Sequence, residues 1–177
     1  MRDGESDDFV LFFGPRPLPG GKIGVSCLSP WWPSPFEVGG ERFATAEHFL
    51  MVAKARLFGD DAIAAHILDS TAPEEAHSLG REVRGFDVAT WAHVRYDVAV
   101  AGNLAKFTQH IDLGFFLTRQ TTDRVLAEAN PSDRVWGIGL AANDMRAKRP
   151  LEWPGQNLLG FALMDVRDQL RTNPLFA

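Results

Sequence analysis

Apolar residues along the chain form short strand-like runs near the start and longer helical patterns after them. The five apolar residues at 9–13 predict a buried strand that ends at a segment rich in Gly and Pro. The segment 36–43 alternates around two consecutive glycines, which is typical of a tight hairpin whose turn needs positive φ. Phe36 is then expected to face Phe43 across the pair.

Most of the remaining chain carries apolar residues at helical spacing. Thr45 is a suitable N-cap for the first of these helices, and Gly59 ends its pattern. The run Thr71-Ala72-Pro73-Glu74 is typical of a capping box with an inserted proline, opening a helix that reaches about residue 83. Further helices are predicted over 61–68, 87–110, 113–117 and 157–170, the last of them capped by Asn157.

These patterns predict a mainly α protein with a small antiparallel sheet near its N-terminus. The run 125–127 is too short for its periodicity to separate strand from helix. A length of 177 residues suits one domain, so we expect a flexible acidic tail at 1–8 and a single domain over 9–177.

Composition and charge narrow the possible functions. A net charge of −5 argues against non-specific binding along a nucleic-acid backbone, although Arg146, Lys148 and Arg149 form a local basic cluster. Cys27 is the only cysteine, which excludes an internal disulfide and a thiolate metal cluster built by one chain. The acidic first residues also lack the pattern of a secretion signal, and a cytoplasmic location is expected.

The first long helix places a carboxylate and an amine on one stripe. Glu47 and Lys54 are seven residues apart, about 700° of rotation, and stand roughly 10 Å apart along the helix axis. Such a pair can bracket a bound sugar, the carboxylate stabilising an oxocarbenium ion or activating water and the amine donating a proton or attacking an anomeric carbon. Two ordinary charges on a solvated helix face are the simpler interpretation of the spacing by itself.

Several tryptophans and turn residues could line a pocket for a base. Trp31 lies in a Pro-rich loop and Trp136 precedes Gly137, where the backbone can approach a ligand closely. Trp91 lies on a helix, where filling the core is the alternative role. Asp133 and Asn157 lie next to turns, where binding groups are often displayed and where turn or cap roles are equally ordinary.

Metal and dinucleotide chemistry are not expected. The five histidines are dispersed and match no zinc spacing such as H-E-x-x-H, so neither a metal nor another cofactor is predicted. The run Trp136-Gly137-Ile138-Gly139 lacks the third glycine and following helix of a dinucleotide fingerprint.

Sequence blocks in a fixed order resemble the NADAR (YbiA-like) family. Several blocks in one order are far more specific than any single motif. They lie at 28–36, 43–48, 54–60, 79–81, 128–133, 136–139, 153–160 and 163–167, with Trp91 and Lys106-Phe107 between them. The resemblance covers nearly the whole chain and departs from the family at Pro30, which stands in a Trp-containing loop where the family usually has Asn.

The resemblance implies an orthogonal helical bundle of the YbiA-like type that hydrolyses N-glycosidic bonds. Glu47 matches the family's acidic helix residue, Lys54 the lysine of its K-A block, and Asp133 with Trp136 its D-x-x-W-G block. We therefore expect Glu47, Lys54 and Asp133 to be catalytic. The expected substrate-binding residues are Trp31, Arg81, Trp91, Trp136, Gly137 and Asn157.

Three functions remain in competition at this level. The first is removal of ADP-ribose from ADP-ribosylated guanine in DNA or RNA, an activity that the family resemblance includes. The second is hydrolysis of riboflavin-biosynthesis intermediates, which suits the acidic net charge better. The third is a non-catalytic module that binds ADP-ribose or NAD, against which the acid and amine together argue. No membrane partner is expected.

Overall fold

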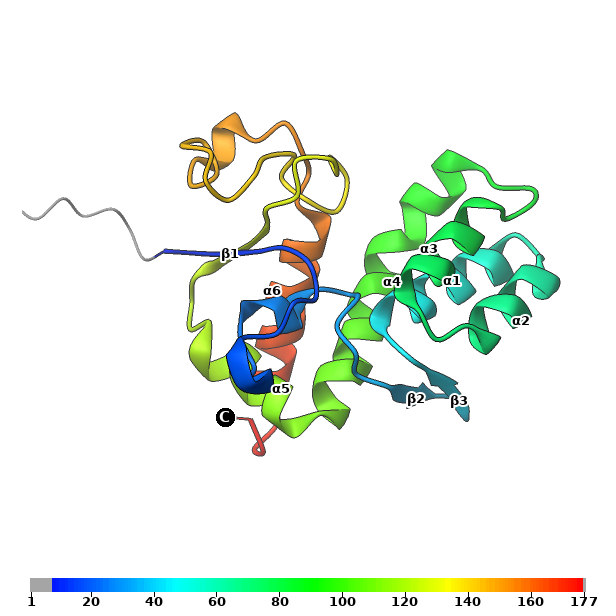
Figure 1. Ribbon diagram of the computed structural model, residues 1–177, viewed down its shortest axis with the longest axis horizontal. Coiled ribbons are helices and arrows are strands. Elements are labelled where there is room, and N and C mark those ends of the chain that lie inside the picture. Colours follow the sequence, from blue (N-terminus) through cyan, green and yellow to red (C-terminus); the bar gives the residue numbers. More distant parts are fainter. Residues whose placement is uncertain (1–7, 177) are drawn as a thin grey trace, which may run out of the picture. The chain divides into compact units, whose positions relative to one another are not determined.

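The computed structural model describes residues 8–176, which divide into two compact units (Figure 1). The helical unit comprises residues 30–111, and the composite unit comprises residues 8–29 with 112–176. The flexible tail expected at 1–8 lies outside the described residues apart from Asp8. The prediction that 9–177 forms a single domain stays a prediction.

The helical unit opens with the predicted hairpin and continues with four helices. Phe36 pairs with Phe43 in antiparallel register, and their ring centroids lie 5.8 Å apart. The two turn glycines have φ values of 61° and 84°, as the pattern predicted. The elements are β2 (Phe36–Val38), β3 (Glu41–Phe43), α1 (Ala46–Leu57), α2 (Asp61–Asp69), α3 (Pro73–Arg81) and α4 (Val88–Gln109).

The starts of α1 and α3 test the N-caps that the sequence predicted. The Thr45 side chain accepts a hydrogen bond from the His48 backbone N–H, so the predicted N-cap of α1 is confirmed. The capping box at Thr71 is wrong: the N-cap of α3 is Ala72, and no side chain caps this helix. Pro73 at the first helical position needs no hydrogen bond for its nitrogen, which makes the missing cap tolerable.

Helix α1 is the centre of the helical unit and packs against α2, α3 and α4. Two glycines, Gly80 of α3 and Gly102 of α4, lie where these helices pack closely on α1. A Cβ on Gly102 of α4 would meet the Phe49 ring at 2.5 Å, so this glycine lets the unbroken helix α4 pack closely on α1. None of the described helices is long and apolar enough to cross a membrane.

The composite unit is built around a parallel strand pair. β1 (Phe9–Phe12) pairs with β4 (Val125–Glu128), which resolves the open run 125–127 as a buried strand. β1 is therefore in a parallel pair outside the antiparallel sheet of the hairpin. The other elements are η1 (Pro19–Gly21), η2 (Val25–Leu28), α5 (Ile111–Phe115), η3 (Phe116–Gln120, a π-helix), η4 (Pro150–Glu152) and α6 (Leu158–Arg171).

The contact between β4 and α6 fixes the core of the composite unit. Asn157 occupies the N-cap position of α6 in a left-handed conformation, but its side chain does not cap the helix. Its Nδ2 donates to the Leu126 carbonyl and its Oδ1 accepts from the Glu128 N–H, at 2.9 and 3.1 Å. The helix therefore begins as predicted, whereas the amide serves the neighbouring strand.

We expect Gly160→Ala to destabilise the composite unit by about 2 kcal/mol. A Cβ at Gly160 would lie 2.1 Å from the Leu126 carbonyl oxygen, and backbone cannot move aside as a flexible side chain can. This steric cost outweighs the roughly 1 kcal/mol by which Ala favours a helix. Urea unfolding measures the change, with Gln169→Ala on the exposed face of α6 as the control. Equal stability of the two variants would contradict the close contact.

Candidate active site

Glu47 is a buried carboxylate in the first turn of α1. Only 7% of the residue is exposed, although carboxylates seldom lie so deep without a partner. Its backbone N–H donates to the Pro30 carbonyl at 3.0 Å, which ties the Trp-containing loop to the start of the helix. Its Oε1 lies 2.8 Å from Nδ1 of His77 on α3.

His77 is the residue of this site that sequence reasoning missed. A carboxylate oxygen can only accept, so the short contact requires the proton on Nδ1 of the imidazole. The hydrogen bond to Glu47 raises the pKa of His77 above its ordinary value, against the opposing effect of partial burial. The His77 ring also lies against the indole of Trp31, with centroids 5.9 Å apart, and 49% of its side chain remains exposed.

Lys54 lies two turns further along α1 and is half-buried. Its Nζ donates to the Gly80 carbonyl at 2.7 Å and stands 4.2 Å from the centre of the Phe86 ring. Burial lowers the pKa of Lys54, and the neighbouring Arg81 guanidinium lowers it further, whereas Glu47 raises it. A larger fraction of this amine is therefore neutral near pH 7 than for an ordinary lysine.

Close packing of α3 on α1 makes these contacts possible. A Cβ on Gly80 would lie 2.1 Å from Sδ of Met51, so a larger residue there would force the Met51 side chain out of its place between the two helices. The chain after α3 is held by Arg84, whose backbone N–H and guanidinium all donate to the buried Asp60 carboxylate. These bonds hold the pKa of Asp60 well below its usual range, so the ion pair persists at neutral pH.

The helical unit thus combines a fixed carboxylate, a histidine and an amine of lowered pKa. Glu47 can stabilise positive charge on a ribose or activate water, and a neutral Lys54 can attack an anomeric carbon. Trp31 and the exposed Arg81 lie beside them and offer a stacking face and a charged donor. Such an arrangement suits the cleavage of a bond between a sugar and a base.

In the composite unit, Asp133 organises the turn before the WGIG block. Its Oδ1 accepts from the N–H groups of Val135 and Trp136 at 2.7 and 2.8 Å. A Cβ on Gly137 would meet the carbonyl oxygens of Glu128 and Asp133 at 2.9 and 3.0 Å, so this glycine lets the loop pack on the end of β4. Asp133 therefore has a structural role in shaping the loop that carries the half-buried Trp136.

The predicted site residues fall into both units. The helical unit brings together Glu47, Lys54 and Trp31 with Arg81, and its Trp91 is largely buried in the first turn of α4. The composite unit holds Asp133, Trp136 and Gly137 with the fully buried Asn157. The role of each residue in catalysis or binding stays a prediction.

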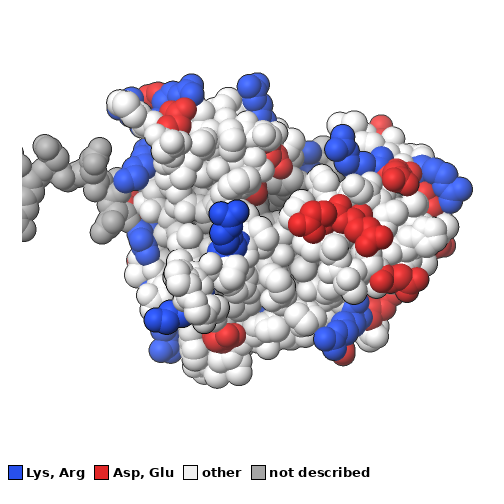
Figure 2. Space-filling model, in the orientation of Figure 1, with Lys and Arg blue, Asp and Glu red and all other residues white. Residues whose placement is uncertain are grey.

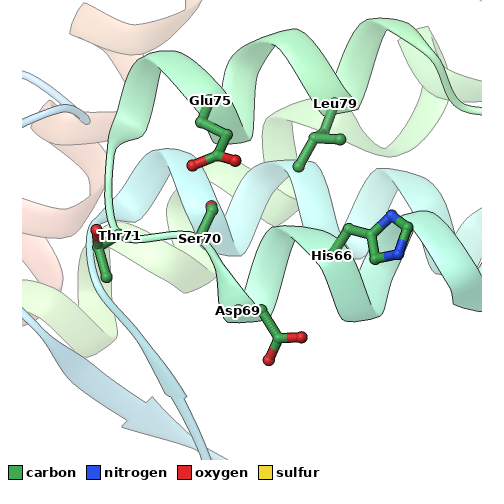
Figure 3. A pocket seen from close by; sticks show the side chains of 6 residues that line it. All are labelled: His66, Asp69, Ser70, Thr71, Glu75 and Leu79. Carbon is green, nitrogen blue, oxygen red and sulfur yellow. The ribbon is translucent and has the colours of Figure 1, made fainter.

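A surface pocket lies between α2 and α3. This shallow pocket of about 360 Å³ is lined by His66, Asp69, Ser70, Thr71, Glu75 and Leu79 (Figure 3). Glu75 and His77 are two residues apart on α3 and so point to opposite sides of it. Across residues 8–176, no group of three His, Cys, Asp or Glu side chains is arranged to hold a metal ion.

Similar proteins identify the family. The NADAR domain model matches residues 20–171. N-glycosidase R617 of Acanthamoeba polyphaga mimivirus is 37% identical over 170 residues, which cover 93% of this chain and 98% of that protein. N-glycosidase YbiA of Escherichia coli is 29% identical over 77% of this chain and 76% of its own length. The NMR structure of Escherichia coli YbiA matches 97% of this chain and 89% of its own, with a TM-score of 0.74 and 26% identity. The mainly α architecture with two small strand pairs is thus that of YbiA, and the chain belongs to the NADAR domain family as a relative of proteins named N-glycosidase.

Proposed function

We propose that the chain is an N-glycosidase that removes ADP-ribose from ADP-ribosylated guanine in nucleic acid. The observation that carries this proposal is the buried Glu47 carboxylate, bonded to His77 and on the same helix stripe as Lys54. A carboxylate at a ribose stabilises the positive charge that develops as the base departs. The names of the viral and bacterial relatives support the type of bond that is cut.

In the proposed mechanism, the ribose lies over the stripe formed by Glu47 and Lys54. The bond between the anomeric carbon and the guanine nitrogen breaks, and its electron pair leaves with the base, which takes up a proton. Lys54 either positions the sugar or attacks the anomeric carbon through its neutral amine, losing a proton to solvent. Water then releases ADP-ribose and restores the enzyme.

The basic cluster offers only modest support for a nucleic-acid substrate. Arg146 is held by two bonds to Asp144, and Arg149 forms an ion pair with Glu152 at 3.3 Å, so their charge is partly offset. On the face drawn in Figure 2, the described residues present acidic side chains gathered over the helical unit and only scattered basic ones. We therefore propose recognition of a modified base with a few phosphate contacts, in the cytoplasm, where the lone cysteine would stay reduced.

Hydrolysis of riboflavin-biosynthesis intermediates is the second candidate. The net charge of −5 and the acidic helical unit favour a small substrate over an extended phosphate backbone. Glu47 and Lys54 would serve the same bond cleavage, so this candidate differs from the first in the leaving base and in the group attached to the ribose. Binding of ADP-ribose without cleavage is the remaining alternative.

One experiment separates these functions. Purified protein is incubated with an oligonucleotide ADP-ribosylated on guanine and, separately, with riboflavin-pathway intermediates, and products are followed by mass spectrometry. We expect release of ADP-ribose from the oligonucleotide. Release of ribose phosphate from the small intermediates alone would replace the first function by the second. Binding of ADP-ribose without any product would show a non-catalytic module.

A further inference from the structure

His77 contacts two other residues of the candidate site, Glu47 and Trp31. It comes from a different helix than Glu47, yet its Nδ1 contacts the carboxylate oxygen at 2.8 Å while its ring lies against Trp31. A histidine that served only to cover the helix surface would need neither contact. The imidazole therefore joins the buried carboxylate to the aromatic face of the loop before α1.

We propose that His77 is the positioning residue of this site, holding the Glu47 carboxylate in its working orientation while the imidazole is protonated. The inference rests on the proposed N-glycosidase function and adds a control of turnover by pH. A carboxylate that is hydrogen-bonded to a charged partner keeps its orientation, whereas one that loses this bond is free to turn. Loss of the imidazolium charge therefore weakens the bond that orients Glu47.

The charges around His77 favour this behaviour in a defined direction. Glu47 on α1 raises the pKa of His77, whereas Lys54 on α1 and Arg81 on α3 oppose the imidazolium charge. The net pKa is raised, so His77 stays charged above the pH at which a free histidine loses its proton. Turnover should decline as pH rises through the pKa of His77, and the stabilising effect of the ion pair should be lost over the same interval.

The pairing can be tested without any substrate. Nuclear magnetic resonance follows the His77 ring signal against pH in the full chain, with the signal assigned by its loss in His77→Gln. We expect the titration midpoint to fall in Glu47→Gln, because the carboxylate that holds the proton is gone. An unchanged midpoint in that variant would overturn the proposal, whatever the enzyme's substrate.

Turnover then shows whether the pair matters for catalysis. We expect His77→Gln to lower kcat by roughly 100-fold near neutral pH, as loss of alignment does, and to flatten the alkaline decline. His77→Lys keeps a positive charge to much higher pH, so it should retain more activity and move that decline upward. Identical pH profiles for wild type and His77→Gln would refute a positioning role. Absence of turnover in wild type would instead refute the proposed function and leave the titration result standing.

Discussion

Glu47→Gln is expected to lower kcat/KM for an ADP-ribosylated oligonucleotide by about 1,000-fold while the protein stays folded. Glutamine keeps the shape of the side chain but removes the negative charge that would stabilise the developing cation. The loss should appear mainly in kcat, because the charge matters most in the transition state. Steady-state kinetics on the ADP-ribosylated oligonucleotide measures it.

Glu74→Gln provides the matched control for this substitution. Glu74 is an exposed carboxylate in the first turn of α3, and the same chemical change there should leave turnover unaltered. Circular dichroism and thermal unfolding establish that both variants fold. Full turnover by folded Glu47→Gln would show that the buried carboxylate has only a structural role.

The second large effect is expected at Lys54. Replacing it by Met removes the amine, and replacing it by Arg keeps the charge but removes the nucleophile, because a guanidinium stays protonated. If the amine attacks the sugar, both variants should lose at least about 100-fold in kcat. Activity of the Arg variant close to that of wild type would show that Lys54 contributes only charge and position.

Two further measurements test the covalent route through Lys54. If the neutral amine attacks the sugar, activity should fall as pH drops and Lys54 becomes protonated. Burial lowers the pKa of Lys54, so this fall should occur at a lower pH than the ordinary pKa of lysine. Borohydride added during turnover should reduce an open-chain adduct and leave a mass increase on Lys54. The exposed Lys22→Arg variant should be trapped as well as wild type. No trapped species with active enzyme would exclude the covalent route.

Local signals determined several elements of this protein directly. The Thr45 cap, the two-glycine turn and the uninterrupted stretch up to Gly59 predicted α1 and the hairpin, because each depends on hydrogen bonds between residues close in the chain. Helical geometry then placed Glu47 and Lys54 on one stripe. Further along the chain, Asp133, which was expected next to a turn, accepts bonds from N–H groups two and three residues after it.

Long-range packing decided what the local signals left open. The pairing of β1 with β4 joins short apolar runs far apart in the chain, and no periodicity in either run indicates its partner. The Asn157 amide looked like a helix cap and instead bonds β4, because buried strand groups must be satisfied. The sequence at Thr71 matches a capping box, but no side chain caps the start of α3.

By itself, then, the amino-acid order determined the mainly α class, the family, and the helix stripe that carries a carboxylate and an amine. Only the tertiary structure brought His77 to Glu47 and the Gly80 carbonyl to Lys54, 30 and 26 residues away in the chain. Those contacts depend on the approach of α3 to α1 that Gly80 permits. The physical reason is that both contacts join residues far apart in the chain. Neither the burial that lowers the pKa of Lys54 nor the Glu47 bond that raises the pKa of His77 can be read from local spacing.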